Sequence, residues 1–148
     1  MPPVTINIDL PDINVWLALI DPDSPKQQTA QHYWENVRTG DIVFCRVTMM
    51  GLLRLSTSRK VMRKNVFTHE EAWEMYRTFI ALPDVLFLPE TDNIENTFAA
   101  LSQVPEAPHH LWTDAYLAAF AITNNARIVS FDSDFTRFPA LNFLHLKA

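Results

Sequence analysis

The chain has 148 residues, of which 48% are hydrophobic, and a formal net charge of −5. This apolar fraction indicates a globular protein with a core of its own and argues against a disordered chain. No uncharged apolar stretch approaches the ~18 residues that a membrane-spanning helix needs, so we expect no membrane association. The length predicts a single domain over residues 1–148.

The N-terminal segment and the cysteine and glycine counts narrow the class of protein further. The N-terminal segment has no basic region followed by an apolar run, so we expect no signal peptide. Cys45 is the only cysteine, which excludes an internal disulfide and is typical of the reducing cytoplasm. The only glycines, Gly40 and Gly51, are too few for a P-loop or a dinucleotide-binding fingerprint. We therefore expect a cytoplasmic protein without a nucleotide cofactor.

Hydrophobic periodicity predicts strands and helices that alternate along the chain. In chain order, the elements expected are a strand over 4–10, helices over 15–20 and about 24–40, a strand over 42–45, helices over 47–55 and about 68–81, a strand over 85–88, helices over about 93–101 and 113–125, and strands over 127–131 and 141–146. Ser24 and the capping box Thr68–Glu71 mark two of the helix starts, and Thr113-Asp114 is expected to cap the helix that follows it. The alternation predicts an α/β fold with a largely parallel sheet.

Aspartates occupy the ends of predicted strands and the starts of predicted helices. Asp12 follows the first strand, Asp114 opens an alanine-rich helix, and Asp132 and Asp134 follow the strand over 127–131. The carboxyl ends of parallel strands form one crevice, so these side chains are expected to converge. Carboxylates that are brought together repel one another and normally need a bound cation. The pattern predicts a hard-metal site.

Each of these aspartates also has a purely structural explanation. Asp12 and Asp114 could stabilise helix starts, where the helix dipole favours a carboxylate by ~0.3–1 kcal/mol. Asp132 and Asp134 could form an Asx turn after a strand. Their shared topological position favours the functional explanation. Oxygen ligands of this kind select Mg²⁺ or Mn²⁺, and the single cysteine and scattered histidines show no zinc-site spacing.

A basic strip lies between positions 46 and 69, where no acidic residue occurs. It contains half of the 12 Lys+Arg of the chain: Arg46, Arg54, Arg59, Lys60, Arg63 and Lys64. Such a strip can contact phosphates on a protein that is acidic overall, although a solvated helix end and loop explain it equally well. Trp112, beside Thr113-Asp114, is the tryptophan best placed for substrate contact, because the others lie in apolar runs typical of a core.

Four sequence segments together resemble the PIN domain family. LPDINVWLALIDPDSP, CRVTMMGLLRLST, TDAYLAAFA and VSFDSDF follow the family's order and separation. They look most like the VapC toxin branch of type II toxin–antitoxin pairs. The resemblance implies a three-layer α/β/α fold with a parallel five-stranded sheet. It also implies an Mg²⁺- or Mn²⁺-dependent endoribonuclease that cuts structured RNA, such as transfer or ribosomal RNA.

The resemblance also assigns roles to individual residues. Asp12, Asp114 and Asp132 match the metal-binding catalytic acids, and Asp134 matches an accessory catalytic acid. The residues expected to bind the substrate are Asn14, Arg46, Arg54, Thr113 and Ser130. The implied partners are an RNA substrate, a VapB-like antitoxin that blocks the acidic groove, and a second copy of the chain in a homodimer.

One departure from the family pattern supports a competing function. Many members carry a glutamate about where Met49 falls, and methionine cannot ligate Mg²⁺. Asp9 is a poor replacement, because strand alternation points its side chain elsewhere. A catalytically weakened PIN domain that binds RNA or protein is therefore the alternative. A phosphatase or dehalogenase using Asp132 and Asp134 as nucleophile and acid is disfavoured, because that pattern belongs after the first strand.

Overall fold

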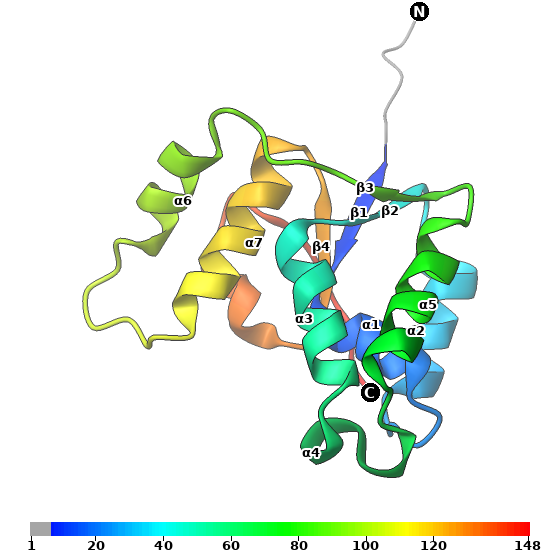
Figure 1. The fold of residues 1–148 in the computed structure, drawn as a ribbon. Coiled ribbons are helices and arrows are strands. Elements are labelled where there is room, and N and C mark those ends of the chain that lie inside the picture. Colours follow the sequence, from blue (N-terminus) through cyan, green and yellow to red (C-terminus); the bar gives the residue numbers. More distant parts are fainter. Residues whose placement is uncertain (1–6) are drawn as a thin grey trace, which may run out of the picture.

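Residues 7–148 are described by a computed structural model, in which a parallel sheet lies between two layers of helices (Figure 1). The strands are β1 (Ile8–Pro11), β2 (Asp41–Phe44), β3 (Val85–Phe87), β4 (Arg127–Ser130) and β5 (Asn142–His145). Their order across the sheet is β3-β2-β1-β4-β5, and every neighbouring pair is parallel. The predicted α/β fold with a parallel five-stranded sheet is confirmed.

The helices fall into two groups on either side of the sheet (Figure 1). One group comprises α1 (Ile13–Ile20), α2 (Gln27–His32), the π-helical η1 (Tyr33–Val37), α3 (Arg46–Ser56) and α5 (His69–Ile80). The other comprises α6 (Ile94–Ser102) and α7 (Leu111–Thr123). Short turns of helix complete the chain: α4 (Arg59–Met62), η2 (Arg63–Asn65) and η3 (Ser133–Arg137). Within residues 7–148, no helix has both the length and the apolar character to cross a bilayer.

Each face of the sheet has its own apolar core. On the α1 side the core is aromatic: Trp16 stacks on Phe44 with ring centroids 4.0 Å apart, and Tyr76 meets Phe44 edge-on. On the α7 side, buried alanines line the helix, and their small side chains let α7 lie close to the sheet. Phe120 and Phe135 fill the space around them. The two cores hold α1 and α7 rigidly at the same end of the sheet, where the aspartates lie.

The end of the central strand β1 positions Asp12 at the carboxyl end of the sheet. Pro11 cannot donate a backbone hydrogen bond, and it occupies the last position of β1, beyond the pairs that β1 forms with β2. The next amide, that of Asp12, donates to the carbonyl oxygen of Val129 in β4 at 2.8 Å. The Asp12 carboxylate then accepts from the Ile13 amide at 2.8 Å and caps α1.

Several predicted boundaries differ from the observed ones. The strand predicted over 4–10 is observed from Ile8, and positions 4–6 lie outside the described residues. The helix expected from Ser24 begins at Gln27, because the Ser24 hydroxyl accepts from the Lys26 amide and closes a separate turn. Its second half is the π-helical η1. The capping box is confirmed: Glu71 and Thr68 exchange hydrogen bonds of 2.8 and 3.1 Å.

Gly51 lies where α3 packs against α1. A Cβ at this position would lie 2.2 Å from Cδ1 and 2.8 Å from Cγ1 of Ile13. Alanine is the better helix former by about 1 kcal/mol, but overpacking costs about 1–3 kcal/mol. We expect Gly51→Ala to lower the free energy of unfolding by about 1 kcal/mol in urea titrations. The added substitution Ile13→Val should recover part of this loss, and a more stable single variant would contradict the close contact.

Candidate active site

Four aspartates from three parts of the chain lie together at the carboxyl end of the sheet. Asp12 follows β1, Asp114 lies in the first turn of α7, and Asp132 and Asp134 begin η3 after β4. Asp114, Asp132 and Asp134 each offer a carboxylate oxygen, and these three atoms lie within 4.8 Å of one another. Hard oxygen ligands at this spacing suit a divalent cation such as Mg²⁺ or Mn²⁺.

Asp12 lies beside this group rather than within it. One of its carboxylate oxygens accepts from the Ser130 hydroxyl at 2.8 Å, and the other accepts from the Ile13 amide. Burial raises the pKa of Asp12, these hydrogen bonds lower it, and repulsion from Asp132 adds to the rise. The predicted ligand set was Asp12, Asp114 and Asp132, whereas Asp134 is the third member of the tightest group.

Ser130 and Asn14 connect Asp12 with the segment after β4 that carries Asp132. The Ser130 side chain is fully buried; its hydroxyl donates to Asp12 and accepts from the Asp132 amide at 2.9 Å. The Asn14 amide nitrogen donates to the Ser130 hydroxyl at 3.2 Å, and its oxygen accepts from the Phe131 amide at 3.3 Å. The enclosed Ser130 thus links the Asp12 carboxylate to the backbone of Asp132, and the substrate-binding role expected for it stays a prediction.

Asp114 carries the clearest electrostatic signature of the site. Burial, followed by repulsion from Asp12, Asp132 and Asp134, raises the pKa of Asp114 to about 6, and the nearby His110 offsets part of the rise. The His110 Nε2 lies 3.6 Å from a carboxylate oxygen of Asp134. Perturbed carboxyl pKa values of this kind are typical of functional sites, where charges are held together against their repulsion.

This raised pKa predicts a pH dependence of stability without metal. Asp114 ionises near its ordinary pKa of 3.8 in the unfolded chain and near 6 in the folded protein. The free energy of unfolding therefore falls as the pH rises from about 3.8 to about 6, and the loss is complete above that range. After a discount for its partial exposure, Asp114→Asn should stabilise the protein by about 1 kcal/mol at pH 7 and by nothing measurable at pH 3.5. Thermal unfolding in EDTA at the two pH values checks this. A gain at pH 3.5 as large as that at pH 7 would count against charge repulsion.

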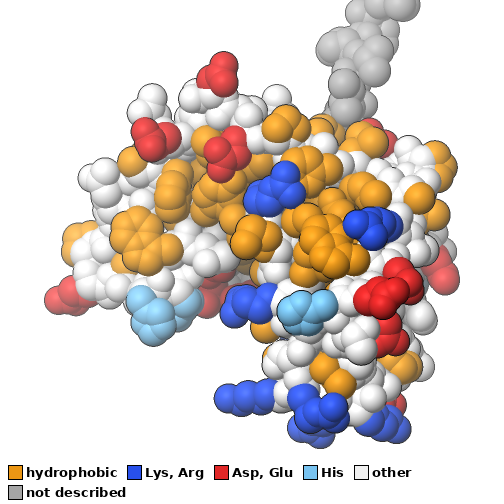
Figure 2. All heavy atoms as spheres, in the orientation of Figure 1, with side chains coloured by type: hydrophobic (Ala, Val, Ile, Leu, Met, Phe, Trp, Pro, Cys, Tyr) orange, Lys and Arg blue, Asp and Glu red, His pale blue; other side chains and the backbone are white. Residues whose placement is uncertain are grey.

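The predicted substrate-binding arginines lie on α3. The Arg46 guanidinium lies over the Phe87 ring, 4.4 Å from its centroid, and donates to the Met49 sulfur at 3.4 Å. Arg54 is exposed and lines a groove of about 590 Å³ between α3 and α5. Figure 2 shows this face, on which Lys and Arg side chains border an apolar patch over α3 and α5 and gather again over α4.

Two predictions at α7 have different outcomes. The helix begins at Leu111, so Thr113-Asp114 does not cap it; the expectation was wrong because the turn at Pro108 already closes onto Leu111, whose amide donates to the Pro108 carbonyl oxygen at 3.0 Å. Thr113 is exposed, as is Trp112, which is 60% exposed and meets Phe98 edge-on. Both are therefore accessible to a substrate, and that role stays a prediction.

Met49 is buried in the aromatic core on the α1 side of the sheet. Its side chain packs with Phe44 and Tyr76 in the core on the α1 side of the sheet, whereas α7, which carries Asp114, covers the other side. The α3 residue that contacts the segment after Asp12 is Gly51, which has no side chain.

This placement predicts the effect of restoring an acid at position 49. Met49→Glu would place a carboxylate in the aromatic core, with Arg46 beside it, so we expect a loss of about 1–3 kcal/mol in the free energy of unfolding. We expect no gain in Mn²⁺ affinity, which calorimetric titration measures. Met49→Gln, of similar size and without charge, is the control. A tighter Mn²⁺ complex in Met49→Glu would show that position 49 does reach the acidic group.

Sequence reasoning missed His110 as a neighbour of the acids. From the sequence, the histidines were weighed as zinc ligands, and the position of His110 just before α7 was the only available signal. The structure also places the Lys26 ammonium over the Phe131 ring, 5.1 Å from its centroid. The distance of 105 positions between these two residues left no pattern that could have predicted the contact.

Comparison with known proteins agrees with this geometry. The sequence model of the PIN domain matches residues 10–141. The chain is 33% identical over 132 residues to Ribonuclease VapC41 of Mycobacterium tuberculosis, covering 86% of this chain and 90% of that one. It is 30% identical over 137 residues to Ribonuclease VapC33 of the same organism, covering 90% and 94%.

Solved structures share the fold at lower identity. VapC20 of M. tuberculosis, described as a sarcin–ricin loop cleaving toxin, aligns with a TM-score of 0.67 at 17% identity, over 87% of this chain and 93% of that one. VapBC2 of Rickettsia felis, solved with a DNA fragment of its promoter, gives 0.63 at 18%, over 95% and 99%. From the domain match and the curated relatives, the chain belongs to the PIN domain family, in its VapC branch.

Proposed function

We propose that this protein is a divalent-metal-dependent endoribonuclease, the toxin of a type II toxin–antitoxin pair. The observation that carries the proposal is the grouping of Asp114, Asp132 and Asp134 within 4.8 Å at the carboxyl end of a parallel sheet. The ribonuclease names of its VapC relatives support the same activity. The alternative of a weakened site keeps its basis in the sequence, since α3 carries no acidic residue, and metal-dependent cleavage separates the two functions.

The chemistry follows from the residues in place. Asp114, Asp132 and Asp134 would hold one or two Mg²⁺ or Mn²⁺ ions, with Asp12 beside them. Such an ion would lower the pKa of an attacking water and would offset the negative charge that develops on the phosphate. The carboxylate of Asp12, fixed by Ser130 and the Ile13 amide, keeps its orientation during the reaction. His110, beside Asp134, contributes positive charge when protonated.

The substrate and partners are proposed from the same resemblance. We propose a structured RNA, such as transfer or ribosomal RNA, as the substrate, with the exposed Arg54 and Thr113 available to contact it. The R. felis VapBC2 structure and a toxin–antitoxin complex from Klebsiella pneumoniae share this fold and support an antitoxin partner. A homodimer and a cytoplasmic location complete the proposal.

RNA cleavage by the purified, antitoxin-free chain tests this function. Total RNA is incubated with Mn²⁺, with Mg²⁺ and with EDTA, and the ends created are mapped by sequencing. We expect cuts at defined positions that leave 5′-phosphate ends, that require the metal, and that are absent with Asp12→Ala. Equal cleavage in EDTA, or by the Asp12→Ala variant, would refute the proposal.

A further inference from the structure

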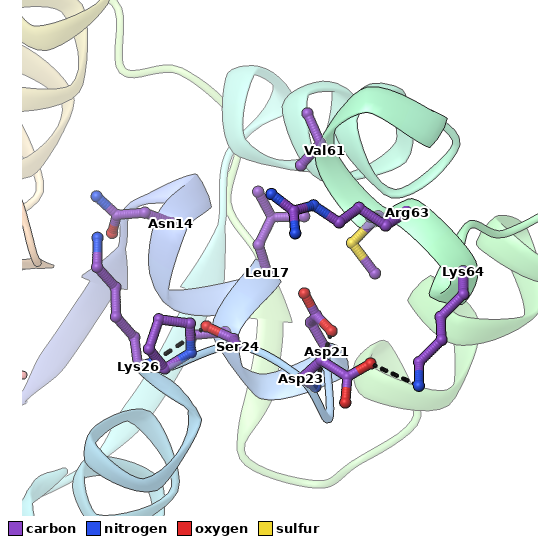
Figure 3. Close-up of a pocket in the computed structure, with 12 residues that line it drawn as sticks. Asn14, Leu17, Asp21, Asp23, Ser24, Lys26, Val61, Arg63 and Lys64 are labelled. Carbon is purple, nitrogen blue, oxygen red and sulfur yellow. Dashed lines mark hydrogen bonds and ion pairs between the residues drawn. The ribbon is translucent and has the colours of Figure 1, made fainter.

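A second hollow opens beside the acidic site, between α1 and the α4–η2 segment (Figure 3). Its volume is about 790 Å³, within the range of about 300–1,000 Å³ typical of ligand pockets. Asn14 forms one end of its lining, and the amide of Asn14 is bonded to Ser130, which in turn bonds Asp12. The end of the groove at Asn14 is therefore linked to Asp12 through the hydrogen bonds of Ser130.

The charged residues of this groove are divided between its ends. In Figure 3, Asn14 and Lys26 lie at one end, Asp21, Asp23 and Lys64 lie at the other, and the Arg63 guanidinium extends between them. The two aspartates are already engaged. The Asn65 amide donates to Asp21 at 3.0 Å and to Asp23 at 2.8 Å, and Lys64 is 3.5 Å from Asp23.

Two cations of the groove are not paired with an acid within residues 7–148: Lys26, at the end near Asn14, and Arg63, between the ends. Both are exposed. The apolar side chains of Leu17, Val61 and Met62 line the surface between them. Cations beside an apolar surface match a polynucleotide, whose phosphates need positive charge and whose bases pack on apolar groups.

The backbone of Arg63 supports a specific role for this side chain. Its φ of 54° and ψ of −125° lie outside the regions that arginine normally adopts. Such conformations persist where the surroundings hold them, and they cluster at ligand-binding sites. Here the bonds of Asn65 and Lys64 to the 21–23 turn hold the α4–η2 segment across the groove. Arg63 is thereby fixed on the groove side of the segment.

We propose that this groove binds the RNA segment next to the cleaved phosphodiester, with Lys26 and Arg63 each contacting a phosphate. The inference rests on the proposed ribonuclease function and adds a substrate-binding site to it. It divides the basic strip by function, because Arg63 lines the groove together with Lys26, which lies outside the strip.

Binding of a labelled RNA tests this inference without cleavage. The probe is a fluorescein-labelled 12-nucleotide single-stranded RNA of mixed sequence, measured by anisotropy over a range of NaCl concentrations in an Asp114→Asn background. Each phosphate contact on a single strand contributes about 0.7 to the slope of log K against log [NaCl], so Lys26→Gln/Arg63→Gln should reduce the slope by about 1.4. Arg77→Gln/Lys147→Gln removes the same charge outside the groove and should change the slope by less than half as much.

The possible outcomes distinguish a failure of the groove proposal from a failure of the proposed ribonuclease function. An unchanged slope and affinity in Lys26→Gln/Arg63→Gln, with the wild-type chain still cleaving RNA, overturns the groove assignment and leaves the proposed function intact. A loss no larger than that of Arg77→Gln/Lys147→Gln overturns it as well. Unchanged RNA binding with weakened antitoxin binding would assign the groove to the protein partner instead. Thermal unfolding of both double variants confirms that they fold.

Discussion

Asp114→Asn is expected to reduce metal-dependent RNA cleavage by about a hundredfold to a thousandfold, the loss typical of removing one group that stabilises charge in a transition state. Asparagine keeps the size of the side chain and one oxygen, so the fold is retained. It removes the charge of one of the three carboxylates that we propose hold a cation. Initial rates of cleavage of a mapped RNA site at saturating Mn²⁺ measure the effect.

Asp92→Asn is the matched control for this experiment. Asp92 is an exposed aspartate in the loop before α6, outside the acidic group, and the substitution changes the net charge equally. We expect its cleavage rate to stay within twofold of wild type. A similar rate for Asp114→Asn and Asp92→Asn would show that Asp114 takes no part in the chemistry.

Asp9→Ala is expected to lower the free energy of unfolding by about 3 kcal/mol, the range found when one partner of a buried ion pair is removed. Asp9 is 3% exposed and accepts from Nε and Nη2 of Arg127, both at 2.9 Å. Its second oxygen also accepts from the buried Tyr33 hydroxyl at 2.6 Å. Removing this carboxylate leaves a guanidinium and a hydroxyl without their acceptor, and urea titration measures the loss.

A surface ion pair provides the comparison for this loss. Asp84 pairs with Arg38 at 2.9 Å, and the Asp84 side chain is 39% exposed. Because water and salt screen such a pair, Asp84→Ala should cost no more than about 1 kcal/mol. Equal losses for Asp9→Ala and Asp84→Ala would contradict the expectation that the buried Asp9 network stabilises the protein more than the surface ion pair does. RNA cleavage by Asp9→Ala should persist at temperatures where it stays folded, since Asp9 lies outside the acidic group.

The strands were predictable because each is a short apolar run closed by a residue that cannot continue it. Pro11 at the end of β1 and the aspartates after β4 are such residues. Helix starts were less predictable, because caps compete with turns. Ser24 closes a turn of its own, and α7 begins before Thr113 because the Pro108 turn leads directly into the helix.

The acids of the site were predictable from topology, since strand ends in a parallel sheet share one edge. The sequence did not predict which three of the four acids form the tightest group. The hydroxyl of Ser130 binds Asp12, so Asp134 rather than Asp12 completes the tightest group. The placement of Met49 was also not predicted, because apolar residues occur on both the buried and the exposed face of α3, as the 59% exposed Met50 shows.

Mn²⁺ binding is the most direct measure of the central claim, that the aspartates at the sheet edge form a cation site. Calorimetric titration at pH 7 compares the wild-type chain with Asp132→Asn and Asp92→Asn, all without antitoxin. We predict that wild type and Asp92→Asn bind Mn²⁺ alike and that Asp132→Asn loses most of the affinity. Absence of binding by the wild-type chain, or equal binding by Asp132→Asn, would contradict the claim.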